Sequence, residues 1–269
     1  MKKLISLLLL LLVVVSCGEY QKALKSDDVA VKYAAAEKMY DKGKYDKAIR
    51  LFEQLAPSYR GKPQAEKMFY MFAQSYYKTN QFYLAGYQFE SFASSYPKSE
   101  KVQEAAFLGA KSYSKLSPVY SLDQTDTYKG IDKLQSFIDR FPNSEYLADA
   151  NILVKELQEK LERKAFENAK GYHTVGEFNR SYGPAIVALD NFIIDFPGTP
   201  YKEQALYYKF DSAFLQAMNS IESKRQERLF AAKNAHASLL KFNPNTEYKA
   251  EVDQKLATIE KELQQYANK

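Results

Sequence analysis

The chain has 269 residues, of which 46% are hydrophobic, with one cysteine, no tryptophan and a formal net charge of +5. A single cysteine excludes a disulfide within the chain, so the fold depends on packing. Lys2 and Lys3 supply part of the positive charge, and the remaining excess is too small to indicate a nucleic acid partner.

The first seventeen residues predict a lipoprotein signal. Two lysines precede an apolar run from Leu4 to Val15, and Ser16 and Cys17 follow. Such a run is typical of a secretory signal peptide and too short to span a bilayer. A cysteine directly after the cleavage site resembles the bacterial lipobox. We therefore expect residues 1–16 to be removed and a covalent lipid on Cys17 to anchor the protein to a membrane. The alternative is an ordinary signal peptide with an incidental cysteine.

From residue 29 onwards the sequence predicts helix after helix, preceded by a lipidated linker over residues 17–28, and shows no convincing strand alternation. A phrase of an aromatic residue, proline, a small or polar residue and Ser or Thr recurs at 96–99, 141–144 and 196–199, with a looser copy at 242–246. We expect the proline to end one helix and the Ser or Thr to cap the next.

Ahead of each phrase, a small residue and two larger ones repeat at i, i+4 and i+7, which places them on one helix face. These are Ala85, Phe89, Phe92; Gly130, Leu134, Phe137; Ala185, Leu189, Phe192; and Ala232, His236, Leu239. The pattern resembles the tetratricopeptide repeat, a pair of helices of about 34 residues. The predicted fold is an all-α tetratricopeptide-repeat superhelix, although a non-repetitive helical bundle remains the alternative.

Five helix pairs fit the sequence, at about 29–63, 66–98, 101–143, 145–198 and 200–246, with a capping helix near 247–266. The fourth pair is expected to begin with a long helix over 145–169. We expect that helix to turn Ala148, Ile152, Leu157 and Leu161 inwards. An insertion at 116–127 separates the helices of the third pair, with Asp126 or Thr127 as the expected N-cap.

Repeats of this kind present a groove to a peptide or a protein. In the second pair, one stripe of residues is expected to face the partner helix: Phe69, Phe72, Ala73 and Tyr76. A second stripe, about 115° round the same helix, is expected to face the groove. Tyrosine suits a groove wall because it offers an apolar ring and a hydroxyl. The groove candidates are Tyr33, Glu37, Tyr40, Tyr70, Gln74, Tyr77, Phe107 and Lys111. Alternatively, these tyrosines only pack neighbouring helices.

The order of these features resembles one family, the outer-membrane lipoproteins called BamD, YfiO or ComL, which belong to the β-barrel assembly machinery. The resemblance is carried by the Cys17 lipobox, the five helix pairs, and the loop with Pro118 that ends in Asp123, Gln124 and Thr125. It implies a periplasm-facing scaffold in the outer membrane of a Gram-negative bacterium that helps recognise, fold and insert β-barrel proteins.

The resemblance also implies partners: unfolded outer-membrane β-barrel proteins, and a BamA-type barrel protein held through its POTRA domains. No cofactor is implied. Residues 29–143 would bind the client, and residues 144–269 would dock the BamA-type protein. The chain departs from the commoner family pattern in the basic run at 224–228. We hypothesise that Arg225, Arg228 and Lys233 contact an acidic patch on that partner. The alternative is a solvated helix face with Glu222 and Glu227 as local partners.

Other function classes fit the sequence less well. His173 and His236 lie in no recognisable metal-ligand or nucleophile spacing, and no glycine-rich phosphate loop is present. SusD-like glycan-binding lipoproteins also combine a lipobox with these repeats. They are usually much longer, and sugar binding favours tryptophan, which this chain lacks. A generic tetratricopeptide adaptor of the cell envelope is the third possibility.

Overall fold

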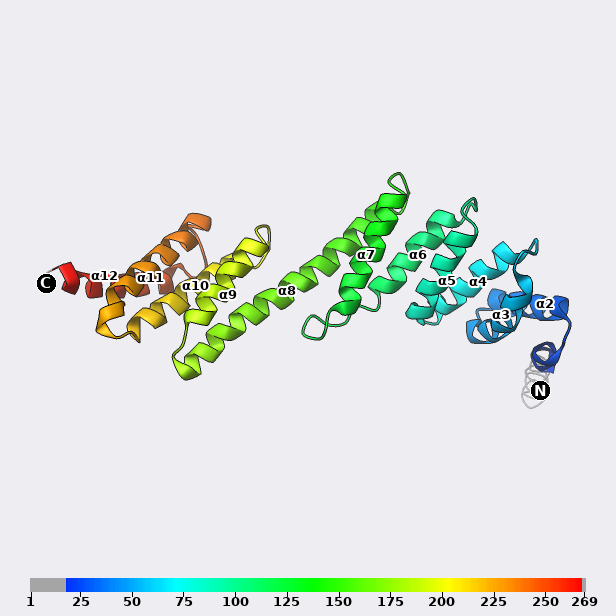
Figure 1. Ribbon diagram of the computed structural model, residues 1–269, viewed down its shortest axis with the longest axis horizontal. Coiled ribbons are helices and arrows are strands. Elements are labelled where there is room, and N and C mark those ends of the chain that lie inside the picture. The colour runs from blue at the N-terminus through cyan, green and yellow to red at the C-terminus, as the bar shows by residue number, and fades with distance from the viewer. Residues whose placement is uncertain (1–17, 268–269) are drawn as a thin grey trace, which may run out of the picture. The chain divides into compact units, whose positions relative to one another are not determined.

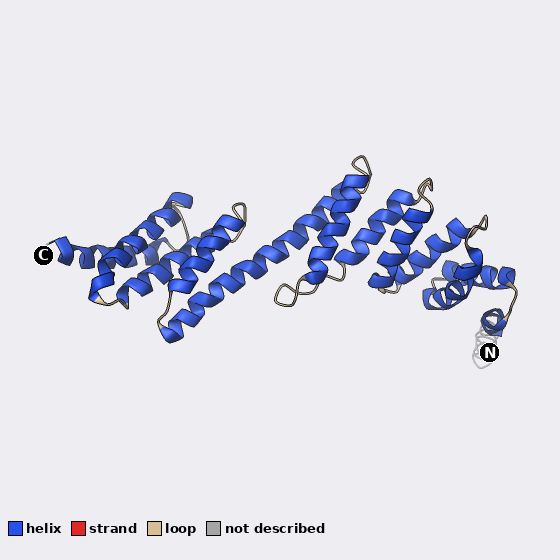
Figure 2. Cartoon of the chain, viewed as in Figure 1, coloured by secondary structure: helices blue, strands red, loops and turns tan. Residues whose placement is uncertain are grey.

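The computed structural model describes residues 18–267, and all regular secondary structure in that range is helical (Figure 2). The prediction of an all-α fold is confirmed. These residues form two compact units. Unit 1 contains residues 18–118 and 122–157, and unit 2 contains residues 119–121 and 158–267.

Unit 1 holds three of the predicted helix pairs (Figure 1). Residues 18–25 are helical, and the helices that follow are α2 (Val29–Asp41), α3 (Tyr45–Tyr59), α4 (Ala65–Lys78), α5 (Phe82–Ser95), α6 (Val102–Ser114), α7 (Thr125–Arg140) and the start of α8 (Leu147–Asn179). Unit 2 holds the rest of α8, α9 (Gly183–Asp195), α10 (Lys202–Met218), α11 (Glu222–Phe242) and α12 (Lys249–Ala267). From α2 to α7, and again from α9 to α12, each helix packs against the next.

The recurring small-large-large face forms the core. All twelve of the positions predicted for it are buried. The interior of each unit is therefore built from the same contact, repeated from pair to pair. Close approach is tightest at glycine. A Cβ atom on Gly130 of α7 would lie only 3.1 Å from the Ser114 Cα of α6, and one on Gly109 of α6 only 3.2 Å from the Phe89 Cβ of α5.

The proline phrase ends helices as predicted. Tyr96, Phe141 and Phe196 are the C-cap residues of α5, α7 and α9. The Ser or Thr acts differently from the prediction. Its hydroxyl oxygen accepts the backbone N–H two residues later, at 3.0 Å from Lys101 N for Ser99 and 3.3 Å from Tyr201 N for Thr199. Because this turn closes before the next helix begins, Lys101 and Tyr201 themselves are the N-caps of α6 and α10.

Two tight turns within pairs share another feature. Gly43 follows α2 and Asn80 follows α4, and both have a left-handed backbone, with φ of 67° and 59°. Glycine and asparagine are the residues that adopt this conformation most readily at a helix end. The equivalent position in two successive pairs therefore carries the residue that the turn requires.

The long helix of the fourth pair differs from its prediction. Helix α8 runs from Leu147 to Asn179, ten residues past the expected end. The extension passes Gly176, where a Cβ atom would lie 2.7 Å from the ring of Tyr182, so tertiary packing overrides the low helix propensity of glycine. The expected inner face is also partly wrong.

Of the four residues predicted to face inwards on α8, only Leu157 is buried. Ala148 and Ile152 are exposed, and Leu161 is half-buried. The buried positions near the start of α8 are Ala150 and Leu157, which pack with Phe107, Leu134 and Phe137. Further along, Phe166 and Ala169 pack with Leu189 and Phe192. The first part of α8 thus completes the core of unit 1, and its remainder begins the core of unit 2.

Two glycine substitutions test whether helix contact or helix propensity decides stability. Gly130→Ala places a methyl group against the backbone of α6, and we expect it to lower the free energy of unfolding by about 1–3 kcal/mol. Gly171→Ala, in the interior of α8, has nothing within 4 Å of the added Cβ and should raise it by up to about 1 kcal/mol. Urea unfolding followed by circular dichroism measures both. A Gly130→Ala protein as stable as the wild type would show that α6 and α7 are not in this tight contact.

Candidate functional site

The predicted groove residues lie on the first helices of the three pairs in unit 1. We call this the first-helix surface: Tyr33, Glu37, Tyr40, Tyr70, Gln74, Tyr77, Phe107 and Lys111, on α2, α4 and α6. All of them except Phe107 are half-buried, with part of the side chain open to solvent. The structure therefore brings the eight residues onto neighbouring helices of one unit, and seven of them remain reachable by a ligand.

The tyrosines of this surface also pack against the second helix of their own pair. The Tyr70 ring lies 5.5 Å from that of Phe92 and 6.2 Å from that of Phe89, centroid to centroid. Tyr33 stacks on Tyr59 of α3 at 5.1 Å. Each of these tyrosine rings is thus held in place by aromatic rings of the second helix of its pair. Holding a ring in this way lowers the conformational entropy that a ligand must remove on binding.

The stripe that was expected to face the partner helix has a second neighbour. The Phe72 ring lies 5.7 Å from Phe52 of α3, and the Tyr76 hydroxyl donates to Glu53 of α3 at 2.9 Å. Helix α4 therefore lies between α3 and α5 and contacts both. This leaves the Tyr70 and Tyr77 side of α4 as the one that faces outwards.

Charged residues that the sequence analysis missed complete the first-helix surface. Lys67 of α4 pairs with Glu37 of α2. Lys101, the N-cap of α6, pairs with Glu104 at 2.8 Å. Lys67 and Lys101 are each matched by a carboxylate, whereas Lys111 lies over the Phe107 ring, with its Nζ 5.4 Å from the ring centre. The surface is therefore nearly neutral in the part of the chain that the structure describes, with one positive charge in excess.

Tyr70 is the centre of this polar network. Its oxygen accepts a hydrogen bond from Gln74 Nε2 at 2.9 Å, and its hydroxyl donates to Glu104. Burial raises the pKa of Tyr70, and the hydrogen bond to Glu104 raises it further. Burial alone would raise the pKa of Glu104, but hydrogen bonds from Lys101 and Tyr70 outweigh that effect and lower it. Glu104 is therefore charged and Tyr70 is neutral at pH 7, a pattern suited to hydrogen bonding.

A covering residue explains why Phe107 differs from its neighbours. Phe107 is only 3% exposed, because Tyr146 stacks on its ring at 5.0 Å. The same arrangement recurs in unit 2, where Tyr201 stacks on Phe166 and Tyr248 on Tyr207. Each covering tyrosine stands two residues after the Ser or Thr of the turn phrase, and this spacing is the sequence signal that could have identified it.

The second pair is the exception to this pattern. Lys101 occupies the covering position there, and its Nζ lies 5.7 Å from the centre of the Tyr70 ring. Because a lysine side chain is long and flexible, it covers a ring less completely than a stacked tyrosine does. Tyr70 is half-buried, whereas Phe107 and Phe166, which are each covered by a tyrosine, are buried.

The loop before α7 has a defined conformation. Helix α7 begins at Thr125 rather than near Asp126 or Thr127, so the predicted N-cap is wrong. The reason is that Asp123 Oδ1 accepts the Thr125 N–H at 2.9 Å and so stabilises an earlier start. Gln124 is the N-cap and is buried, and its side-chain oxygen accepts from Thr127 Oγ1 at 2.7 Å. Pro118 is half-buried at the other end of the loop.

The three cations proposed for docking all have partners within unit 2. Arg225 of α11 pairs with Glu262 of α12 at 2.8 Å, and Lys233 pairs with Glu260, also on α12, at 2.8 Å. Arg228 Nη1 donates to Ser220 Oγ at 2.7 Å. The carboxylates that pair with Arg225 and Lys233 thus come from the neighbouring helix, a contact that spacing along α11 could not predict.

The two histidines are buried in unit 2 rather than exposed in a cleft. His173 Nδ1 lies 2.9 Å from Ser212 Oγ, and its Nε2 lies 3.4 Å from Asp211 Oδ2. Because Ser212 is fully buried, a substrate has no access to this pair of side chains. His236 lies 3.0 Å from Asp253. Within residues 18–267, no three His, Cys, Asp or Glu side chains are placed to hold a metal ion.

The predicted signal peptide and Cys17 lie outside the described residues, so their chemistry stays a prediction. Among residues 18–267, no helix has the length and apolar character needed to cross a membrane.

Comparison with known proteins identifies the family. A search of curated proteins found no match to this chain. A family model for YfiO, described as an outer membrane lipoprotein, matches residues 25–179 and again residues 178–268. The two matches together take in most of both units. The chain therefore belongs to the YfiO family of outer membrane lipoproteins.

Proposed function

We propose that this protein is a lipid-anchored, non-catalytic scaffold of the β-barrel assembly machinery, facing the periplasm. The family match carries the proposal, because it covers both units of an all-helical chain. The structure supports it in two ways: unit 1 presents an aromatic and polar surface, and unit 2 presents exposed apolar and basic side chains. Residues 29–143 would bind unfolded barrel proteins, and residues 144–269 would dock a BamA-type protein through its POTRA domains.

The first-helix surface has the chemistry that an extended, unfolded client needs. A chain without secondary structure offers unpaired N–H and C=O groups as well as apolar side chains. Gln74, Glu104 and the tyrosine hydroxyls can pair with the former, and the rings of Tyr33, Tyr70 and Tyr77 can contact the latter. No deep pocket is required, which suits a site that must accept many client sequences.

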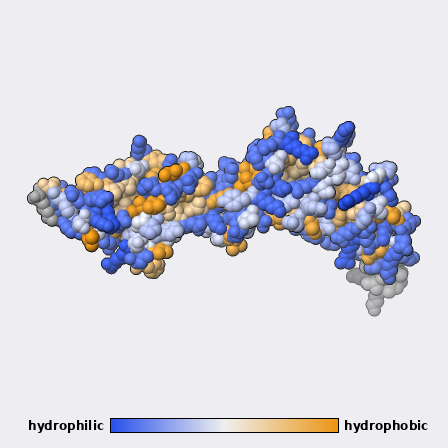
Figure 3. All heavy atoms as spheres, in the orientation of Figure 1, coloured by the Kyte–Doolittle hydropathy of each residue, from blue (hydrophilic) through white to orange (hydrophobic). Residues whose placement is uncertain are grey.

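Unit 2 supports a protein partner by its exposed apolar side chains. Val187 and Ile194 of α9 and Phe230 of α11 are each at least half exposed, and Figure 3 shows apolar side chains gathered over this part of the unit. Exposed apolar clusters with a charged rim are typical of protein interfaces. Phe230 and Lys233 are spaced three residues apart on α11, so an apolar anchor and a cation lie side by side.

The first experiment tests the proposed pathway and the lipid anchor together. Depletion of the protein from its own bacterium should lower several outer-membrane β-barrel proteins at once, as measured by quantitative proteomics of the outer membrane. Wild-type protein should restore them. Cys17→Ser should leave the membrane fraction and restore them poorly, because it cannot carry the acyl chains that hold the protein at the membrane. A defect confined to growth on one polysaccharide would contradict the proposal.

The second experiment tests the first-helix surface. Tyr70→Ala with Tyr77→Ala should weaken binding of an unfolded barrel-protein peptide by about tenfold or more, since truncating a central anchor typically costs over 1 kcal/mol. Fluorescence anisotropy gives the affinity, and circular dichroism checks the helical content. The matched control is Tyr83→Ala with Tyr128→Ala, two exposed tyrosines outside this surface, which should bind normally. Unchanged binding by the Tyr70 and Tyr77 variant would refute the site.

The third experiment tests docking through α11. Lys233→Glu alone breaks the pair with Glu260, so it could act through the fold. The double change Lys233→Glu with Glu260→Lys keeps the pair but reverses both charges. We expect this swap, Arg228→Glu and Phe230→Ser each to reduce copurification with the BamA-type protein severalfold. Full copurification by all three variants would place the docking site elsewhere.

A further inference from the structure

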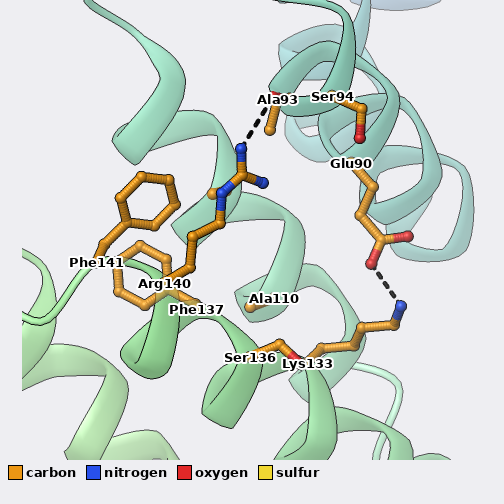
Figure 4. A pocket seen from close by; sticks show the side chains of 10 residues that line it. Glu90, Ala93, Ser94, Ala110, Lys133, Ser136, Phe137, Arg140 and Phe141 are labelled. Atoms are coloured by element: carbon orange, nitrogen blue, oxygen red, sulfur yellow. Dashed lines mark hydrogen bonds and ion pairs between the residues drawn. The ribbon is translucent and has the colours of Figure 1, made fainter. Parts of the chain in front are cut away.

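A second hollowed surface lies in unit 1, on the second helices of the pairs. A pocket of about 310 Å³ opens between α5 and α7 (Figure 4). Its floor is Ala106 and Ala110 of α6, and the rings of Phe137 and Phe141 form part of its wall. Ala106 and Ala110 lie about 100° round α6 from Phe107 and Lys111. The pocket is therefore separate from the first-helix surface.

Polar contacts cross this pocket at two places (Figure 4). Lys133 of α7 pairs with Glu90 of α5 at 2.7 Å. Arg140 Nη2 donates to the carbonyl oxygen of Ala93 at 3.4 Å. Between these contacts the alanine floor leaves a hollow of the size of one large side chain or slightly more, with the Phe137 and Phe141 rings and the hydroxyls of Ser94 and Ser136 around it.

An equivalent groove of about 500 Å³ lies on the other side of α5, between α3 and α5. Phe92 and Tyr96 occupy the positions in it that Phe137 and Phe141 occupy in the first, when the repeats are aligned on their prolines. Phe69, Phe72 and Tyr87 add three more aromatic rings, and Ser91 and Ser95 add hydroxyls. Unit 1 thus carries the same apolar feature twice, once on each side of α5.

Each groove has an arginine with unused hydrogen-bond donors. Among the described residues that line the α3–α5 groove, Arg60 alone is charged. In the α5–α7 pocket, Glu90 is neutralised by Lys133 and also accepts from the Tyr113 hydroxyl at 3.1 Å, which leaves the charge of Arg140 uncompensated. Within residues 18–267, neither Arg60 nor Arg140 forms an ion pair with a carboxylate. A guanidinium fork with free donors is suited to a carboxylate, which it can bind through two parallel hydrogen bonds.

We propose that these two grooves dock an acidic, extended segment of a partner protein, with one apolar side chain in each groove and a carboxylate on Arg60 and on Arg140. The apolar lining selects the anchors, and the two uncompensated arginines select their acidic neighbours. The docked segment is a different ligand from the unfolded client of the proposed function. It binds in these grooves, whereas the client binds on the nearly neutral first-helix surface.

The spacing of the anchors follows from helix geometry. The two grooves flank a single helix whose diameter with side chains is about 10 Å. An extended chain advances about 3.3 Å per residue. The two apolar anchors should therefore stand about three or four residues apart in the partner segment, with acidic residues next to them.

A synthetic peptide tests the proposal directly. The probe is a fluorescein-labelled peptide with two phenylalanines three residues apart and an aspartate beside each, titrated with the full mature protein in fluorescence anisotropy. We expect saturable binding that weakens at least about tenfold in the Arg60→Gln, Arg140→Gln double variant. Both arginines are exposed, so the fold should be retained. Ala106→Phe, which copies Phe69 of the preceding repeat and fills the pocket floor, should weaken binding by a similar factor.

Control variants distinguish the two grooves from the first-helix surface and from general charge attraction. Arg50→Gln removes an exposed arginine of α3 that lines neither groove and should bind the probe normally, as should the Tyr70→Ala, Tyr77→Ala variant. A matched peptide with lysines in place of the aspartates should bind at least tenfold more weakly. The proposal fails if the acidic probe does not bind, if the lysine peptide binds equally well, or if the double arginine variant is unaffected. Concentration-dependent dimerisation abolished by Arg60→Gln, Arg140→Gln would instead assign the grooves to a second copy of the chain.

Discussion

The close approach of neighbouring helices at small residues is the contact on which the rest of the structure depends. Helices can touch backbone to backbone only where one of them lacks a side chain. Gly130 meets the backbone of Ser114 in this way, and Gly109 meets Phe89. Once this contact is fixed, the larger residues at i+4 and i+7 are forced into the space beside it. The remaining faces of each helix then have a set direction, and two of them become surfaces available to partners.

The turn between pairs adds a second repeated constraint, and it bears directly on function. The phrase that ends each pair also positions the residue that covers a ring of the preceding first helix. Tyrosine in that position buries the ring, as Tyr146 does with Phe107. Lysine leaves it accessible and adds a hydrogen-bonding charge, as Lys101 does beside Tyr70. At this fixed structural position the chain thus carries either a tyrosine stacked on the ring or a lysine beside it, while the fold around it stays the same.

The sequence predicted the features that depend on local periodicity. The helix pairs, the recurring small-large-large faces and the helix ends at the prolines follow from spacing along one chain segment, and the structure agrees with them, whereas the inner face predicted for α8 was largely wrong. The sequence could not predict features that depend on contacts between residues far apart along the chain. The extension of α8 past Gly176 depends on Tyr182 packing against it. The partners of Arg225 and Lys233 lie on α12, and the burial of Phe107 depends on a residue from the next pair.

The candidate site likewise combines features that the sequence could predict with features that it could not. The stripe of Tyr33, Tyr70 and Tyr77 was predictable, because it is a periodic feature of first helices. The pairing of the charges around it was not, because Lys67 of α4 pairs with Glu37 of the separate helix α2, and Lys101 comes from the turn before α6. The pairing of Lys67 and Lys101 with carboxylates keeps the first-helix surface nearly neutral. The grooves beside α5 lack that balance. Unit 1 therefore presents an aromatic and polar surface on α2, α4 and α6 and, beside α5, two grooves that each carry an arginine without a carboxylate partner among the described residues, and the two sets share no side chain.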